Sequence, residues 1–161
     1  HTADGLEHEE SGKPSTAATD HRAQLDKRRR KIEAFDYGDL WAERGGAESG
    51  LLVLTWGSSS GAVREAVERC MEQGLPVRWL APRLLLPARP EEFRRALAGV
   101  ERVLVVEQSH SEQFHRYLRA HYDLPPRVRV LARPGPLPLT PGEITIEIQA
   151  LAREAGGEEA A

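Results

Sequence analysis

Hydrophobic and polar positions follow a regular rhythm only in the second part of the chain. From residue 51 onward, short apolar runs alternate with longer segments whose apolar positions recur every three or four residues. The short runs predict buried strands, and the longer segments predict amphipathic helices. We expect strands at 51–55, 76–81, 102–107 and 128–131, and helices at 60–73, 91–98, 111–121 and 142–155.

This alternation of strands and helices predicts an α/β domain over residues 51–155. Residues 103–106 are continuously apolar, which is typical of a parallel strand buried on both faces. Connections between parallel strands place helices over the sheet. We therefore expect three layers, with a mostly parallel sheet of about five strands and helices on both of its faces.

The first 50 residues lack this rhythm. Residues 1–19 are polar and contain scattered Gly, Pro, Ser and Thr, which indicates an irregular connector. A basic helix is expected at about 20–35, and a second connector with Trp41 as an anchor at 36–50. Residues 156–161 are expected to form a disordered tail.

Composition narrows the classes of partner. The chain has 161 residues, a formal net charge of −3 and an isoelectric point near 6.1, which argues against nucleic acid or membrane as the partner of the whole chain. No apolar run approaches the ~20 residues of a membrane helix. The chain begins with His1 and not with Met, and we expect it to be a fragment of a longer protein.

The basic run Lys27–Lys31 leaves two interpretations open. It could bind RNA, an acidic lipid or an acidic partner. Alternatively, the helix is solvated and leans on a neighbouring subunit or domain, which we favour because the stacking aromatics of nucleic-acid binders are missing.

The single cysteine excludes an internal disulfide, and we expect no metal site. Cys70 lies on the apolar stripe of its helix, so we interpret it as a packed thiol and not as a nucleophile. His8 lies in a Glu-rich segment without the His-Glu-x-x-His spacing of a metal motif. This cysteine usage fits a reducing cytoplasm.

Residues 57–61 are the first candidate site, because ligands of open α/β sheets bind outside the carboxyl ends of the strands. Small residues before a helix leave backbone N–H groups free for an anion. The segment lacks the endings of a P-loop or a dinucleotide motif, so a tight turn whose serines cap the helix remains the alternative. The candidate anion or interface loop consists of Gly57, Ser58, Ser59, Ser60 and Gly61.

Glu107 and His110 form the second candidate site. A carboxylate at a strand end beside an imidazole could serve as a general base and its orienting group. Alternatively, Glu107 pairs across a subunit interface and His110 or Ser109 begins the next helix. We favour the interface or capping interpretation and expect no catalytic residue in this chain.

Five segments, in order, resemble the α subunits of 2-oxoglutarate:ferredoxin oxidoreductases, within the 2-oxoacid:acceptor oxidoreductase α family. The segment GLEHEESGKP at 5–14, followed by a basic helix, resembles the stretch that leaves the pyrimidine domain of that subunit. The others resemble its carboxyl-terminal, transketolase-like domain. They are TWGSSSGAVREA at 55–66, LLLPARP at 84–90, VVEQ at 105–108 and the closing PGP and LTPGEI at 134–144.

The resemblance implies a set of functional expectations. Enzymes of this family decarboxylate a 2-oxoacid on thiamine diphosphate, pass electrons through iron–sulfur clusters to ferredoxin and release an acyl-CoA. It implies that thiamine diphosphate, Mg²⁺ and [4Fe–4S] clusters are held by other domains or by a β subunit. The expected partners are this β subunit, ferredoxin through the complex, and a second copy in a dimeric assembly, in the cytoplasm. Trp56 and Gln108 depart from the residues expected in many members, which leaves the choice of 2-oxoacid open.

Two hypotheses of different classes follow. The first is a non-catalytic assembly domain of a thiamine-dependent 2-oxoacid:ferredoxin oxidoreductase, which makes succinyl-CoA if the substrate is 2-oxoglutarate. The second is a stand-alone α/β module that binds a small anion or phosphate at 57–61. A nucleic-acid-binding role of the basic helix ranks third.

Overall fold

The computed structural model describes residues 5–158. The chain forms two compact units, and the boundary between them in the sequence lies between Gly38 and Asp39. The first unit contains a short antiparallel hairpin and a helix. Its elements are β1 (Glu7–His8), β2 (Pro14–Ser15) and α1 (Ala18–Glu33). The hairpin occupies part of the segment expected to be irregular, and the helix begins two residues earlier than expected.

The second unit is built on a five-stranded sheet with the order β3-β5-β4-β6-β7. Strands β4 to β7 are mutually parallel, and β3 is antiparallel to β5 at one edge. The strands are β3 (Ala42–Gly46), β4 (Leu51–Leu54), β5 (Val77–Pro82), β6 (Arg102–Glu107) and β7 (Arg127–Ala132).

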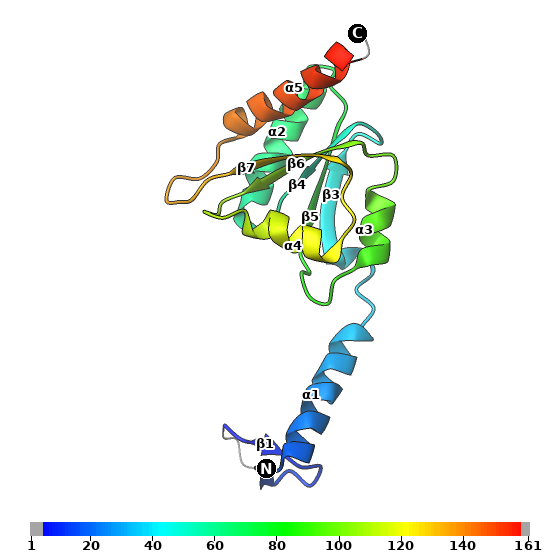
Figure 1. The fold of residues 1–161 in the computed structure, drawn as a ribbon, viewed down its shortest axis with the longest axis vertical. Coiled ribbons are helices and arrows are strands. Elements are labelled where there is room, and N and C mark those ends of the chain that lie inside the picture. The colour runs from blue at the N-terminus through cyan, green and yellow to red at the C-terminus, as the bar shows by residue number, and fades with distance from the viewer. Residues whose placement is uncertain (1–4, 159–161) are drawn as a thin grey trace. The chain divides into compact units, whose positions relative to one another are not determined.

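Helices cover both faces of this sheet, so the predicted α/β fold with three layers is confirmed (Figure 1). Helices α2 and α5 pack against each other on one face, and α3 and α4 lie on the other. The helices are α2 (Ser60–Glu72), α3 (Pro90–Ala96), α4 (Gln113–His121) and α5 (Pro141–Glu158), with short 3₁₀ turns η1 (Gly38–Trp41) and η2 (Gly57–Ser59).

The core follows the period-2 alternation of the strands. Val53 and Leu104 face α2 and α5 within one apolar cluster, which also contains Ile144, Ile148 and Cys70. On the opposite face, the ring of Phe93 from α3 stacks on that of Tyr122, with ring centroids 3.9 Å apart. These buried layers hold the strand ends, and therefore the loops that follow them, in fixed positions.

Strand β3 lies within residues 36–50, which were expected to be a connector. Its sequence, AERGG, has neither the alternation nor the β-branched residues that indicate a strand. Its pairing with β5 depends on close approach, because a Cβ on Gly45 would lie 2.9 Å from the Trp79 indole nitrogen. At Gly46, φ is +92° and a Cβ would lie 2.3 Å from the Val77 carbonyl oxygen. Tertiary contact, and not local pattern, therefore defines this strand.

The helix ends differ in how closely they agree with the sequence: α2 ends at Glu72, one residue before the expected end, whereas α5 extends beyond its expected end. Gly74 has φ +80° and its N–H donates to the Met71 carbonyl, a glycine termination that is common at helix ends. Helix α5 continues to Glu158, into the segment 156–158 that was expected to belong to the tail. Residues 159–161 of that expected tail lie outside the described residues.

Candidate functional site

The carboxyl ends of four parallel strands place both candidate segments at one edge of the sheet. Strand β4 has β5 on one side and β6 on the other, so the chain reverses its direction of strand addition there. In open α/β sheets such a switch point is the usual position of a ligand. The segments at this edge are 55–61 after β4, 82–90 after β5, 107–112 after β6 and 133–140 after β7.

The candidate loop 57–61 is a 3₁₀ turn that continues directly into α2. The Ser60 hydroxyl donates to the Gly57 carbonyl oxygen over 2.8 Å, so this serine closes the turn. Ser59 occupies the N-cap of α2 and makes no capping hydrogen bond through its side chain. Ser58 and Gly61 are exposed. The tight turn of the alternative interpretation is present, but its serines do not cap α2, because the Ser60 hydroxyl donates to a carbonyl oxygen and the Ser59 side chain makes no capping hydrogen bond.

Two neighbours fix the start of this loop. Thr55 is fully buried, and its hydroxyl has no hydrogen-bond partner among residues 5–158. The Trp56 ring stacks on Phe114 of α4, with centroids 6.1 Å apart, although 45% of Trp56 remains exposed. The loop after β4 is thereby attached to α4.

Glu107 is the only charged residue in the described chain that is buried, with 1% exposure, and its carboxylate caps α4. Oε2 accepts hydrogen bonds from the Phe114 N–H at 2.8 Å and from the Ser109 hydroxyl at 2.7 Å. Oε1 accepts from the His115 N–H at 3.0 Å. The first N–H groups of a helix lack partners within the helix and carry partial positive charge, so a carboxylate there is well stabilised.

The expected neighbour His110 takes no part in this arrangement. It is exposed, and within residues 5–158 it makes no hydrogen bond, whereas both oxygens of Glu107 are occupied by other donors. Helix α4 begins at Gln113, after Glu112 in the left-handed region at φ +54°, so neither Ser109 nor His110 is its first residue. The Ser109 hydroxyl oxygen nevertheless accepts a hydrogen bond from the Gln113 N–H at 3.2 Å. Glu107 itself caps the helix, a role that the sequence analysis did not assign to it, and the structure does not bring Glu107 and His110 together as an acid–base pair.

Sequence reasoning missed two side chains that hold the other loops. The Tyr117 hydroxyl of α4 donates to the Leu85 carbonyl oxygen, and the Gln108 amide donates to that of Leu137 over 3.3 Å. Burial raises the pKa of Tyr117, with a further contribution from its hydrogen bond to Tyr122. Both contacts join residues that are far apart in the sequence, so no local pattern could predict them.

A third missed feature had a readable signal. Thr140 and Glu143 form a capping box at the start of α5, in which the Glu143 carboxylate accepts from the Thr140 N–H at 2.8 Å. Glu143 also pairs with Arg133, with 2.6 Å between Nη1 and Oε1. These hydrogen bonds, that of Arg133 foremost, lower the pKa of Glu143 to about 2. The Thr-x-x-Glu spacing before an apolar helix was visible in the sequence.

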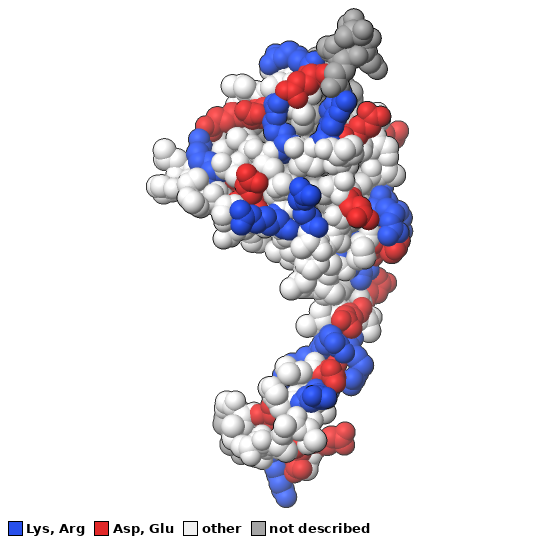
Figure 2. Space-filling model, viewed as in Figure 1, with Lys and Arg blue, Asp and Glu red and all other residues white. Residues whose placement is uncertain are grey.

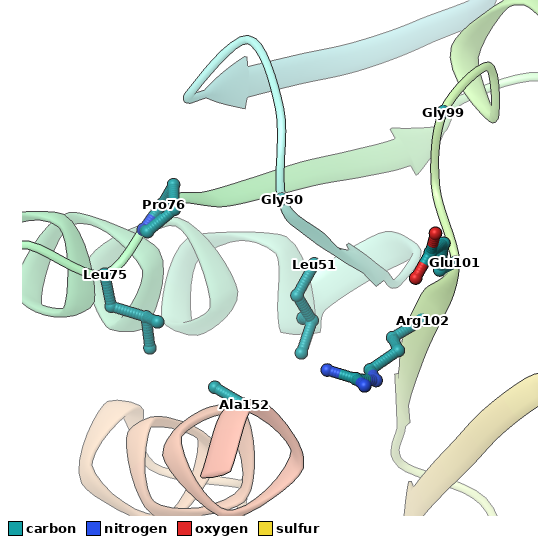
Figure 3. A pocket seen from close by; sticks show the side chains of 8 residues that line it. All are labelled: Gly50, Leu51, Leu75, Pro76, Gly99, Glu101, Arg102 and Ala152. Atoms are coloured by element: carbon teal, nitrogen blue, oxygen red, sulfur yellow. The ribbon is translucent and has the colours of Figure 1, made fainter. Parts of the chain in front are cut away.

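A cavity of about 300 Å³ lies at the other end of the sheet, where the strands begin (Figure 3). It is open between the start of β4, the start of β6 and α5. Its lining combines apolar side chains with one acid and one base from β6 and the residue before it. The lining residues are Gly50, Leu51, Leu75, Pro76, Gly99, Glu101, Arg102 and Ala152. This cavity is therefore separate from both candidate segments.

The described residues offer no grouping of metal ligands. No cluster of three or more His, Cys, Asp or Glu side chains in residues 5–158 is arranged to hold a metal ion. Cys70 is fully buried, and burial raises the pKa of its thiol, which makes it a poor nucleophile. No helix among the described residues is long and apolar enough to cross a membrane.

Comparison with known sequences shows which proteins this chain is similar to. A family profile for pyruvate:ferredoxin oxidoreductase core domain II matches residues 49–144. The chain is 30% identical over 137 residues to the α subunit of 2-oxoacid:ferredoxin oxidoreductase 2 from Aeropyrum pernix, covering 81% of this chain and 21% of that one. It is 25% identical over 154 residues to the corresponding subunit from Saccharolobus solfataricus, covering 93% and 24%. The chain thus spans about a fifth to a quarter of these relatives.

Solved structures agree with the sequence matches. A 2-oxoglutarate:ferredoxin oxidoreductase from Magnetococcus marinus, with 2-oxoglutarate, coenzyme A and succinyl-CoA bound, aligns over 93% of this chain and 26% of its own. The TM-score is 0.71 and the identity 29%. A transketolase from Pichia stipitis aligns over 73% of this chain and 18% of its own, with a TM-score of 0.51 and 14% identity, which shows a shared fold alone.

Proposed function

This chain belongs to the core domain II family of pyruvate:ferredoxin oxidoreductases, as a domain of a 2-oxoacid:ferredoxin oxidoreductase α subunit, and we propose that its role there is non-catalytic assembly. The observation that carries the proposal is the position of Glu107. The Glu107 carboxylate, which the sequence offered as a candidate base at the sheet edge, uses both oxygens to cap α4. The acid at the switch point therefore stabilises a helix and is not available to substrate.

The proposed reaction of the complete enzyme converts 2-oxoglutarate and coenzyme A to succinyl-CoA and CO₂, with reduction of ferredoxin. The support for 2-oxoglutarate is the Magnetococcus marinus enzyme, which was solved with 2-oxoglutarate, coenzyme A and succinyl-CoA bound. The relatives from Aeropyrum pernix and Saccharolobus solfataricus are named only for a 2-oxoacid. A broader 2-oxoacid specificity is thus the alternative within the same reaction class.

The donor set of this chain does not fit an iron–sulfur cluster. A [4Fe–4S] cluster takes four thiolates, and the chain contains a single cysteine, Cys70, which is buried in the core. We therefore place the clusters on other domains or subunits, and from the family resemblance we propose the same for thiamine diphosphate and Mg²⁺. Those domains would carry out the reaction, and this domain would contribute to their assembly into the oligomer.

The proposed partners are a β subunit and, through the complex, ferredoxin, within a dimeric assembly in the cytoplasm. Of the expected interface residues, His110 and the loop 57–61 are accessible at the sheet edge, so we assign subunit contacts to them. Glu107 lies behind them and would support this edge through α4.

Turnover by the assembled oxidoreductase tests the role of Glu107. The substitution is Glu107→Gln, and the matched control is Glu68→Gln, an exposed acid of α2 without an ion pair among the described residues. The measurement is dye reduction driven by 2-oxoglutarate and coenzyme A, divided by the amount of assembled complex. We expect Glu107→Gln to lower the yield of complex and to leave kcat unchanged. If Glu107 were a general base, the substitution would instead lower kcat of the fully assembled enzyme by about 10²- to 10⁴-fold.

A further inference from the structure

The cavity at the start of the strands has an apolar floor that the core holds in place. Leu51 is 8% exposed and belongs to the core cluster, and Leu75 packs against that cluster. Ala152 of α5 lies across the cavity from these two side chains (Figure 3). The volume of about 300 Å³ is at the lower end of the range of about 300–1,000 Å³ that is typical of small-molecule sites. The floor is therefore preformed, and its size suits a small ligand.

Two side chains of opposite charge stand at one wall of this cavity. Glu101 and Arg102 are consecutive residues at the start of β6, and both belong to the lining. Figure 3 shows the Arg102 guanidinium directed into the space between Leu51 and Ala152, with the Glu101 carboxylate at the same wall. The cavity therefore offers a group that binds anions and a group that binds cations beside an apolar floor.

Both charged groups can accept a ligand. The Glu101 carboxylate is exposed and makes no ion pair or hydrogen bond among residues 5–158. Arg102 does have another interaction within the chain. A guanidinium nevertheless carries five N–H donors in a planar fork, so Arg102 can hold a ligand carboxylate in addition to its partner in the chain.

The neighbouring strand places a further cation beside Arg102. Arg127 of β7 lies directly opposite Arg102 in the register between the two strands. The next arginine of this strand, Arg129, is paired with Glu147 and Glu154 of α5. The carboxylate of a ligand is therefore expected on the Arg102 side of the cavity.

We propose that this cavity binds an apolar α-amino acid, such as leucine or valine. An α-amino acid carries an ammonium group, a carboxylate and a side chain on one carbon atom. Arg102 would bind the carboxylate and Glu101 the ammonium group, while the side chain would contact the floor formed by Leu51, Leu75 and Ala152. A zwitterion pairs both charges of the wall at once, whereas a simple carboxylic acid or a simple amine leaves one of them without a partner.

A polyanion suits this part of the molecule less well. On the face of the second unit that Figure 2 shows, acidic and basic residues are interspersed, so no broad field of one sign would attract nucleic acid or an anionic membrane. The cavity also lies at the opposite end of the strands from the loop 57–61. The amino acid would thus bind away from the edge to which we assign subunit contacts, and the inference is independent of the proposed function.

Isothermal titration calorimetry of the purified 161-residue chain with L-leucine and with L-valine tests the proposal. Three comparison ligands each lack one recognised group. The compound 4-methylpentanoate lacks the ammonium group of leucine, 3-methylbutylamine lacks the carboxylate, and glycine lacks the side chain. We expect L-leucine to bind with a Kd of about 1 mM or below, and each comparison ligand to bind at least about tenfold more weakly.

Three variants locate the site. Glu101→Gln and Arg102→Gln should each weaken the binding of L-leucine about tenfold, because each removes one charged partner. Ala152→Phe should abolish binding, because the added ring fills the cavity from α5. Since Arg102→Gln also removes the other interaction of this arginine, the decision rests on the other two variants, which replace an exposed and a half-buried residue.

Matched controls carry the same chemical changes outside the cavity. Glu68→Gln and Arg64→Gln remove exposed charges of α2 that have no ion pair among the described residues. Arg153→Phe adds a ring at an exposed position of α5 that does not line the cavity. All three should bind L-leucine as the wild type does, and circular dichroism verifies that every variant retains its helix content.

Several results would overturn the proposal. One is the absence of saturable binding of either amino acid at about 10 mM, tenfold above a Kd of about 1 mM. Equal affinity for L-leucine and for 4-methylpentanoate or 3-methylbutylamine would show that the site does not recognise a zwitterion. Unchanged affinity in both Glu101→Gln and Ala152→Phe would show that the amino acid binds elsewhere on the chain.

Discussion

Replacing Glu107 by alanine should destabilise the second unit by about 3 kcal/mol. The substitution leaves the N–H groups of Phe114 and His115 and the Ser109 hydroxyl without their acceptor. A hydrogen bond to a charged group contributes about 1.5–3 kcal/mol, and loss of a helix cap costs about 1 kcal/mol. Burying the carboxylate itself costs several kcal/mol, which offsets part of this sum.

Chemical unfolding of the full chain provides the assay. Trp41 and Trp79 are 3% and 8% exposed, so their fluorescence reports on the sheet and on the layer around it. Extrapolation of urea unfolding curves gives the free energy for the wild type, for Glu107→Ala and for the control Glu68→Ala. The control should stay within about 0.5 kcal/mol of the wild type, because exposed positions away from special contacts have small effects.

A second variant separates the charge from the shape of the side chain. Glu107→Gln keeps one oxygen acceptor and turns an amide N–H₂ toward backbone donors, so its loss of stability should be comparable to or smaller than that of Glu107→Ala. If both variants were as stable as the wild type, the carboxylate would not be a structural cap. Its burial would then have to serve chemistry or a subunit contact, and the reasoning from its three hydrogen bonds would be refuted.

The remaining predictions concern the edges of the fold. Folding lowers the pKa of Glu143 to about 2 from its ordinary 4.5, so its pair with Arg133 stabilises the chain above pH 4.5 and loses that contribution as the pH falls toward 2. Glu143→Gln should therefore lower the melting temperature at pH 7 and converge with the wild type near pH 2; parallel curves would contradict this. Cys70 should react with a disulfide reagent far more slowly in the native chain than in urea, and equal rates would show that its thiol is accessible. Gly46→Ala should destabilise the chain by at least about 1–3 kcal/mol because its φ is +92° and its Cβ would meet the Val77 carbonyl, whereas Gly61→Ala, with open space around it, should be neutral or stabilising in the same unfolding assay.

The parts of the fold that could be predicted are those in which one face or both faces of an element are apolar. Residues 103–106 predict a buried parallel strand, and the structure has β6 (Arg102–Glu107) at this position. Strand β3 could not be found in the same way, because Gly45 and Gly46 form a strand through close approach to β5. Its polar, glycine-rich sequence has the composition of a loop.

The candidate site shows the same division. The sequence places Glu107 at a strand end and suggests a base or an interface acid, but it does not indicate that this carboxylate caps α4. The role of Glu107 depends on where α4 begins. The helix begins at Gln113, two residues later than expected, and the N–H groups of Phe114 and His115 therefore donate to the carboxylate. The Thr140–Glu143 capping box, in contrast, needs only a spacing of three residues and was readable before the fold was known.

Turnover by the isolated chain and by the complex that contains it tests the central claim most directly. The assay is the reduction of a redox dye that depends on both 2-oxoglutarate and coenzyme A, measured with the purified 161-residue chain and with the complex purified through a tag on it. A non-catalytic assembly domain predicts activity that co-purifies with the tagged chain in the complex, and none from the isolated polypeptide. Turnover by the isolated chain, or a tagged complex devoid of 2-oxoacid activity, would contradict the account.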